Sequence, residues 1–176
     1  MSHKIAVVLG TAREGNASDR VVKFLKKNIS DRDDFEVEVV KVSDHLFSKT
    51  TLGDDDVVKN WKEIVSENDA FIFVTPEYNH SFPGELKILL DSLYKEYKGK
   101  VAAIAGVSMG PVSGARMIES LKILLHTLNF EIAQRTIGVG NVQKSLSEEG
   151  KASEDSKDSL EKQLSGVLEE ITEKLK

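Results

Sequence analysis

The sequence predicts an α/β fold, a three-layer sandwich in which a five-stranded parallel sheet has helices on both faces. Two observations support this prediction. Apolar runs of strand length alternate with segments whose apolar residues recur at helical spacing. The runs at 5–9, 70–74 and 101–107 are continuously apolar, as in strands that are buried on both faces. Right-handed crossovers make such a sheet parallel, and five-stranded sheets of this length commonly have the strand order 2-1-3-4-5.

The first part of the chain provides two strands with a helix between them. The apolar run at 5–9 ends at Gly10, and apolar residues then recur at helical spacing between 21 and 29. At 35–40 phenylalanine and valine alternate with glutamate, which indicates a half-buried strand near an edge of the sheet.

The middle of the chain repeats this alternation. An apolar stripe at helical spacing covers 57–65, and the next strand, at 70–74, stops at Thr75-Pro76. Pro83-Gly84 then opens a third helix, because proline is favoured in the first helical turn. The apolar residues of that helix extend from 86 to 97.

The last part of the chain completes the sheet and adds a closing helix. A fourth strand is expected at 101–107, a fourth helix at 118–128 and a fifth strand at 130–137. Residues 144–159 are polar and charged, and they predict a surface loop or an extra helical turn. Apolar residues then recur at helical spacing from 160 to 175, which indicates an amphipathic helix.

Length and composition narrow the function. The chain has 176 residues, no cysteine and a formal net charge of −5, and we expect one domain over residues 1–176. The absence of cysteine excludes disulfides, thiolate metal ligands and a cysteine nucleophile. The negative charge argues against a nucleic-acid surface, and the apolar runs are too short for a membrane span or a secretion signal. We therefore expect a cytoplasmic protein that binds neither nucleic acid nor membrane.

The loop after the first strand is a candidate phosphate site. In open sheets of this kind, ligands bind beyond the carboxyl ends of the strands, where the strand order reverses. Residues 10–18 place small and hydroxylated side chains before a helix, where free backbone N–H groups and the helix dipole favour an anion. Arg13 adds a charged fork that suits phosphate. The alternative is a helix cap at Asn16 or Ser18 with Arg13 in solvent. The loop is neither a Walker loop nor a G-x-G-x-x-G fingerprint.

The loops after the third and fourth strands reach the same edge. Residues 75–84 contain two prolines and present Tyr78 and Phe82 in a stiff turn, which suits the edge of a flat heteroaromatic ring. Residues 106–115 contain glycines that allow the backbone to approach a ligand closely. Either loop alone could be a plain turn. Three unusual loops at one end of one sheet together indicate a ligand site.

Segments of these loops resemble the NADPH-dependent FMN reductase family, which comprises flavodoxin-like quinone, azo and chromate reductases, and the resemblance covers nearly the whole chain. The segments are Leu9-Gly10-Thr11-Ala12-Arg13, Thr75-Pro76-Glu77-Tyr78-Asn79 with the trailing Pro83-Gly84 and Leu86-Lys87, and Ser108-Met109-Gly110 through Gly114-Ala115-Arg116. The Thr-Pro-Glu-Tyr-Asn block is highly specific to that family, and the other two blocks are moderately so.

The resemblance implies a flavodoxin-like fold and an FMN site built from the three loops. The phosphate would lie on the first loop, against Thr11, Arg13, Asn16, Ala17 and Ser18. The isoalloxazine ring would be lined, largely by backbone groups, by Pro76, Glu77, Tyr78 and Asn79. The far side of the flavin would be closed by Ser108, Met109, Gly110 and Gly114. This chain departs from the family pattern at Asn16 and Ser18, where relatives often have Ser and Asn, and at Pro111, which lacks an N–H.

The activity that the resemblance implies is that of an FMN-dependent NAD(P)H oxidoreductase with a ping-pong cycle. Hydride passes from NADPH or NADH to flavin N5, and two electrons then pass to a small-molecule acceptor such as FMN, a quinone or an azo compound. No side chain is expected to act as an essential acid or base. The resemblance also implies a homodimer or a homotetramer.

Two other classes of function remain open from the residues. A flavodoxin-like electron carrier would pass single electrons to a protein partner, although the Thr-x-Thr-Gly-x-Thr phosphate loop of flavodoxins is missing. A regulatory module would keep the fold and lack the cofactor.

Other chemistry-bearing residues give weaker signals. The four histidines have no metal-like spacing, so no metal site is expected. Of these, His80 alone lies in a site loop, where a role in substrate contact or proton supply competes with plain solvent exposure. The acidic runs at 31–34 and 54–56 are typical of loops and helix starts. No G-x-S-x-G elbow accompanies the serines, which argues against a hydrolase.

Overall fold

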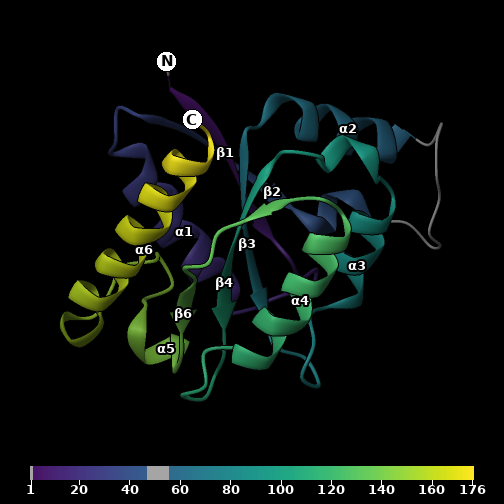
Figure 1. Ribbon diagram of the computed structural model, residues 1–176. Coiled ribbons are helices and arrows are strands. Elements are labelled where there is room, and N and C mark those ends of the chain that lie inside the picture. Colours follow the sequence, from purple (N-terminus) through teal and green to yellow (C-terminus); the bar gives the residue numbers. More distant parts are fainter. Residues whose placement is uncertain (1, 47–55) are drawn as a thin grey trace.

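A parallel sheet forms the centre of the molecule (Figure 1). The structure, a computed structural model, describes residues 2–46 and 56–176. The strand order is β2-β1-β3-β4-β5, with β6 also paired to β4, and this confirms the predicted topology. The strands are β1 (His3–Leu9), β2 (Phe35–Lys41), β3 (Ala70–Pro76), β4 (Val101–Val107), β5 (Glu131–Ile132) and β6 (Ile137–Val139).

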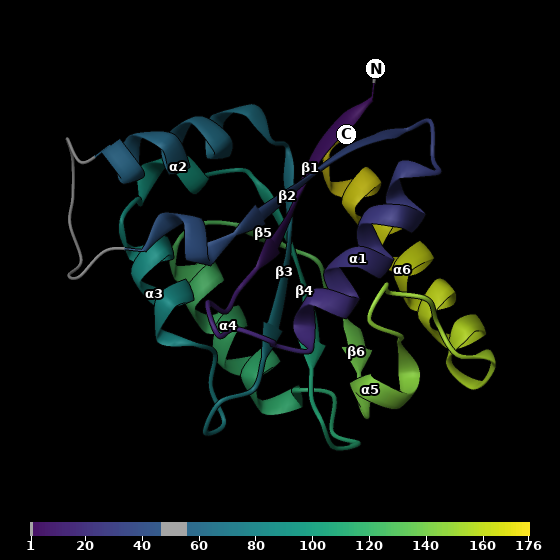
Figure 2. The ribbon, with the colours of Figure 1, turned by 180° about the vertical axis from the view of Figure 1, so that it is seen from behind.

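Helices cover both faces of the sheet, as predicted. They are α1 (Ser18–Ser30), α2 (Asp56–Glu67), α3 (Gly84–Asp91), α4 (Ala115–Thr127), α5 (Val142–Ser145) and α6 (Glu154–Lys174). α1 and α6 pack on one face, while α2, α3 and α4 pack on the other (Figure 2). Successive strand side chains point to opposite faces. Ile72 and Val74 therefore join the core under α1 and α6, whereas Phe71 and Phe73 join the other core.

The fifth strand is interrupted, in contrast to the continuous strand expected at 130–137. β5 pairs with the start of β4, and β6 pairs with its end. Between them, the backbone N–H groups of Gln134 and Arg135 donate to the two carboxylate oxygens of Glu170, at 2.6 and 2.9 Å. Because α6 supplies this acceptor, the chain leaves the ladder for these residues and rejoins it at Ile137.

The third helix is shorter than its apolar pattern predicts. α3 ends at Asp91, because the Ser92 hydroxyl donates to the Leu89 carbonyl at 2.7 Å and takes up a helix-terminal acceptor. The later apolar residues belong to a separate 3₁₀ turn, Lys95–Tyr97. Another 3₁₀ turn, Val42–His45, follows β2 without a sequence signal.

The polar segment expected at 144–159 contains both of the structures that its composition allows. α5 provides an extra helical turn, an antiparallel bridge joins Leu146 to Ala152, and α6 begins at Glu154. Of the acidic run at 54–56, the first two residues lie outside the described residues, and Asp56 begins α2. Within the described residues, no helix is both long and apolar enough to cross a membrane, and no cluster of acidic or histidine side chains could hold a metal.

Candidate functional site

A hollow of about 190 Å³ lies where the loops after β1, β3 and β4 meet, and we call it the loop hollow. It is lined by Arg13, Gly15, Asn16, Ala17, Ser18, Pro76, Tyr78, Val107, Ser108, Met109, Val142 and Gln143. Eight of the thirteen predicted site residues are among them. Larger hollows of about 590 and 680 Å³ lie around Asn129 and Arg135, away from these loops. Another hollow of about 260 Å³ is lined by Pro111 and Ser113 of the third loop but by no residue of the other two loops, whereas the loop hollow is lined by all three.

The first loop offers free hydrogen-bond donors at the start of α1. The backbone N–H groups of Gly15, Asn16 and Ala17 have no acceptor among the residues that the structure describes. Ala17 is the N-cap residue and provides no side-chain cap. Unpaired N–H groups at the positive end of a helix attract anions. The loop therefore has the donor set of a phosphate site.

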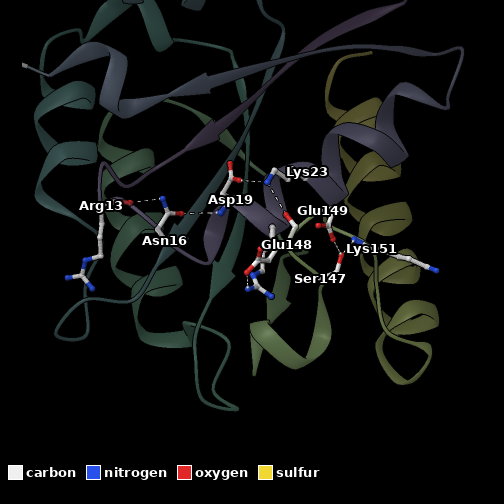
Figure 3. Close-up of polar contacts among 9 residues, drawn as sticks. Arg13, Asn16, Asp19, Lys23, Ser147, Glu148, Glu149 and Lys151 are labelled. Carbon is white, nitrogen blue, oxygen red and sulfur yellow. Dashed lines mark hydrogen bonds and ion pairs between the residues drawn. The ribbon is translucent and has the colours of Figure 1, made fainter.

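Asn16 stabilises the shape of this loop from within. Its side-chain amide donates to the Arg13 carbonyl at 2.8 Å, and its side-chain oxygen accepts the Asp19 N–H at 3.1 Å (Figure 3). The N-cap residue is thus Ala17 and neither Asn16 nor Ser18, although the Asn16 side chain accepts an N–H of the first helical turn. The backbone N–H of Asn16 has no acceptor among the described residues. Asp19 is paired with Lys23 at 2.8 Å, which raises the pKa of Lys23 and offsets a negative charge close to the free donors.

Thr11 does not line the hollow, although it was expected to contact phosphate. Its buried hydroxyl lies 3.2 Å from the Tyr78 hydroxyl and 3.5 Å from Glu85 Oε1. The same Glu85 oxygen accepts the Ala12 N–H at 3.1 Å. The Arg13 guanidinium lies 4.3 Å from the centre of the Tyr78 ring, in a cation–π arrangement. Thr11 therefore joins the first loop to the loop after β3, and Glu85 joins the first loop to the start of α3.

The loop after β3 is a tight hairpin. Tyr78 and Ser81 exchange two backbone hydrogen bonds, at 2.8 and 3.0 Å. The two residues between them, Asn79 and His80, have φ values of 49° and 67°. Positive φ at both central positions is the signature of a type I′ turn. The turn directs Asn79 and His80 into solvent, and only Tyr78 and Pro76 of this loop line the hollow.

Glu77 lies behind the loop hollow and does not line it. Its backbone N–H donates to the Val107 carbonyl at 3.3 Å, which joins the loop to the end of β4. One carboxylate oxygen lies 3.4 Å from Arg116 Nη1, and the other is buried without a partner among the described residues. Glu77 therefore connects the hairpin to the start of α4.

The third loop is fixed by Ser108. The Ser108 hydroxyl donates to the Gly110 carbonyl at 2.6 Å and accepts the Ser113 N–H at 2.9 Å. Ser108 and Met109 line the hollow, whereas Gly110 and Gly114 do not. Gly114 has φ of 70° and is the N-cap residue of α4, so its conformational freedom serves the turn into that helix.

The structure also adds residues that the sequence did not indicate. Val142 and Gln143 of α5 form one wall of the hollow, and Gly15 and Val107 complete the lining. α5 reaches the site because the Asn141 and Val142 N–H groups donate to the carbonyls of Gly110 and Ser108. Only Gly15 lay in a segment singled out as phosphate-binding. The wall from α5 had no sequence signal.

A comparison of the sequence with protein families identifies the family of this chain. The NADPH-dependent FMN reductase family matches residues 3–144. The chain belongs to this family. The match includes the three loops and the first turns of α1, α3 and α4, and it ends within α5.

Individual proteins agree with this assignment. The NAD(P)H-dependent FMN reductase LOT6 of Saccharomyces cerevisiae is 25% identical over 148 residues, which cover 73% of this chain and 76% of LOT6. The structure of FerB, a flavoenzyme NAD(P)H:(acceptor) oxidoreductase from Paracoccus denitrificans, matches with a TM-score of 0.81 and 23% identity, over 97% of this chain and 98% of FerB. A flavodoxin from Pseudomonas aeruginosa matches with a TM-score of 0.61 and 17% identity, over 96% and 99% of the two chains. The fold is flavodoxin-like, as predicted.

Proposed function

We propose that this protein binds FMN at the loop hollow and uses it to pass electrons from NADPH or NADH to a small-molecule acceptor. The observation that carries the proposal is the set of free N–H groups at the start of α1, which faces a hollow shared with the loops after β3 and β4. Membership of the reductase family supplies the class of reaction.

The residues present fit FMN. The N–H groups of Gly15, Asn16 and Ala17 and the Arg13 guanidinium would hold the phosphate, since these donors have no acceptor among the described residues. Tyr78, Ser108 and Met109 would contact the ring. At about 190 Å³ the hollow is smaller than the roughly 300–1,000 Å³ of most small-molecule sites, so part of the cofactor would lie outside it, against the loops.

The protein's own part in the reaction is binding and orientation. Bound FMN supplies the hydride chemistry, and the chain needs no acid or base of its own. Thr11 contacts Tyr78, and Glu85 accepts the Ala12 N–H. These contacts fix the position of the first loop, which carries the phosphate donors, relative to Tyr78, which would contact the ring. Met109 is 59% exposed and offers an apolar edge on which a nicotinamide or a quinone can pack.

We also propose a homodimer. The apolar residues at 86–97 do not all supply an interface, because Leu89, Leu90 and Leu93 are buried in the core of the subunit, whereas Tyr94 is 55% exposed. The large apolar side chains that remain exposed include Met109 and Val112 beside the loop hollow. Sedimentation at micromolar concentration should give the mass of a dimer, and a monomer would contradict this part of the proposal.

One set of measurements on the purified protein tests the proposed function. We expect a flavin absorbance spectrum, or an FMN-induced rise in melting temperature if the protein is isolated without cofactor. We also expect the protein to oxidise NADPH or NADH at steady state when a quinone is present as the acceptor. Binding without turnover would instead indicate an electron carrier, and absence of binding would indicate a module that has lost the cofactor.

A charge variant and its control locate the phosphate end. Arg13→Gln should weaken FMN binding by about tenfold, because a hydrogen bond to a charged group contributes roughly 1.5–3 kcal/mol. Arg32→Gln removes an equal charge that is paired with Asp34 elsewhere on the surface, and it should leave FMN affinity unchanged. Equal affinities for the two variants would show that Arg13 does not contact the phosphate.

A further inference from the structure

The segment from Leu146 to Ala152, which we call the strap, lies beyond the residues that match the family. It follows α5 directly and forms a small hairpin. Leu146 and Ala152 form an antiparallel bridge, and the Ser147 N–H donates to the Lys151 carbonyl at 2.9 Å. The Gly150 N–H donates to the Ser147 carbonyl at 3.0 Å. The residues of the strap do not line the loop hollow, but the strap joins α5 to α1.

Two basic side chains of α1 anchor the strap through its backbone. Arg20 Nη1 donates to the Leu146 carbonyl at 2.9 Å. Lys23 Nζ donates to the Glu148 carbonyl at 2.9 Å (Figure 3). The Leu146 side chain is buried in the core between the sheet and α1 and α6. The Glu148 carboxylate also lies 3.4 Å from Arg20, but the Glu148 side chain is 82% exposed. The anchoring therefore depends on carbonyl oxygens and burial more than on this surface ion pair.

Gly150 brings the strap into direct contact with the backbone of α1. The residue is buried and has φ of 78°. A Cβ atom at Gly150 would lie 2.7 Å from both Lys23 Cβ and the Phe24 backbone nitrogen, and 2.9 Å from the Arg20 carbonyl oxygen. These distances leave no space for a side chain. The strap and α1 thus pack as closely as two backbones can at this point.

Both of the elements that the strap joins line the loop hollow. α1 begins with Ser18, which lines the hollow together with Ala17, and α5 contributes Val142 and Gln143. Lys23 connects the strap to the phosphate loop as well, because it also binds Asp19, whose N–H is held by Asn16 (Figure 3). The contacts of the strap with α1, outside the hollow, therefore add to the hydrogen bonds that hold α5 on the third loop.

We propose that the strap is a positioning element of the cofactor site, with Gly150 and Arg20 as its positioning residues. It holds α5 against α1 and so sets the width of the hollow at its phosphate end. This inference rests on the proposed binding of FMN. A loosened strap should leave the free N–H groups of the first loop intact, while α5 moves away from them and the affinity for FMN falls.

Gly150→Ala tests the proposal, with Gly99→Ala as a matched control. Gly99 has φ of 79°, and no atom lies within 4 Å of the position of its Cβ. Both variants introduce the same backbone strain, and only Gly150→Ala also forces the strap from α1. We expect Gly150→Ala to weaken FMN binding by about tenfold or more and Gly99→Ala to change it by less than about twofold, because small displacements of binding groups are costly. Both are measured well below their melting temperatures.

Amide hydrogen exchange without FMN provides an independent readout. Gly150→Ala should accelerate exchange in α5 and in the first turn of α1, and Gly99→Ala should not. If the wild-type protein does not bind FMN but Gly150→Ala accelerates exchange in α5, the proposed function is refuted and the mechanical role of the strap is retained. Normal FMN affinity in Gly150→Ala would refute the role of the strap in the site.

A second pair of variants covers the case in which Gly150→Ala fails to fold. Arg20→Met removes the donor to the Leu146 carbonyl, whereas Glu148→Gln leaves both carbonyl anchors in place. We expect weaker FMN binding only for Arg20→Met. Equal affinities for the two variants would contradict the proposal.

Discussion

Substitutions of His80, in the turn at Asn79 and His80, should change the stability of the protein without changing its activity. A type I′ turn requires positive φ at both central positions, and asparagine followed by glycine is the preferred pair. This chain has histidine at the second position, with φ of 67°. Histidine is under backbone strain there, because the left-handed conformation costs an L-residue about 1–2 kcal/mol. Substitution by glycine removes that strain.

The expected gain follows from two opposing contributions. Relief of about 1–2 kcal/mol is reduced by the extra freedom of glycine in the unfolded chain, roughly 0.4–1 kcal/mol, which leaves about 1 kcal/mol. For a chain of this size, 1 kcal/mol corresponds to roughly 2–4 °C in melting temperature. His80→Ala removes the same imidazole and keeps the strain. His80→Gly should therefore melt roughly 2–4 °C above His80→Ala in a calorimetric or fluorescence scan.

The same two variants decide whether the imidazole takes part in turnover. His80 is exposed and makes no polar contact with the described residues. Both variants should therefore oxidise NADPH at the wild-type rate. A loss of turnover shared by both would show that the imidazole contacts substrate or supplies a proton. A melting temperature of His80→Ala equal to or above that of His80→Gly would refute the type I′ assignment.

Three further predictions concern buried or bridging groups. Glu85→Ala removes the acceptor of a loop N–H and should cost about 1–2 kcal/mol and weaken FMN binding, while Glu85→Gln keeps the acceptor and should do neither. The N–H of the buried Trp61 donates to the Tyr97 hydroxyl at 2.7 Å, and Tyr97→Phe removes this partner. That variant should lower the free energy of unfolding in urea melts by about 1–3 kcal/mol. Tyr94 is exposed, and Tyr94→Phe should change the free energy of unfolding by less than about 0.5 kcal/mol. Burial lowers the pKa of His45, so the unfolded state binds its proton first and stability should fall as the pH drops below about 6.5. His45→Phe should flatten that slope between about pH 6.5 and 5 in pH-dependent denaturation, and an unchanged slope would exclude His45 as its source.

The fold was predictable from the sequence because its signals are local. The continuously apolar strands and the helical stripes depend on neighbouring residues, and the order of the strands is the one that five-stranded sheets of this length commonly have. The break in the fifth strand was not predictable, because its cause is an acceptor 35 residues away in α6, Glu170 on the N–H of Arg135. The early end of α3 depends on a single serine hydroxyl, Ser92, which lies within an apolar pattern that continues past it.

The candidate site was predictable where one loop supplies its own chemistry. Ala17 and Ser18 line the hollow. They could be predicted because any helix start that follows a strand carries free N–H groups. Thr11 does not line the hollow, and its contact with the Tyr78 hydroxyl of another loop could not be predicted from its own segment. Gln143 was missed because α5 reaches the hollow through backbone contacts with the third loop. Contacts between distant segments leave no periodic trace in the sequence.

The acceptor role of Glu170 has a consequence for synthesis on the ribosome. The first four strands are translated well before α6, so a nascent chain can assemble β2-β1-β3-β4 while the N–H groups of Gln134 and Arg135 still lack their protein acceptor. Since β6 leads into α5, the last wall of the loop hollow settles only after Glu170 has left the exit tunnel. The FMN binding proposed above would therefore occur late, after release of nearly the whole chain.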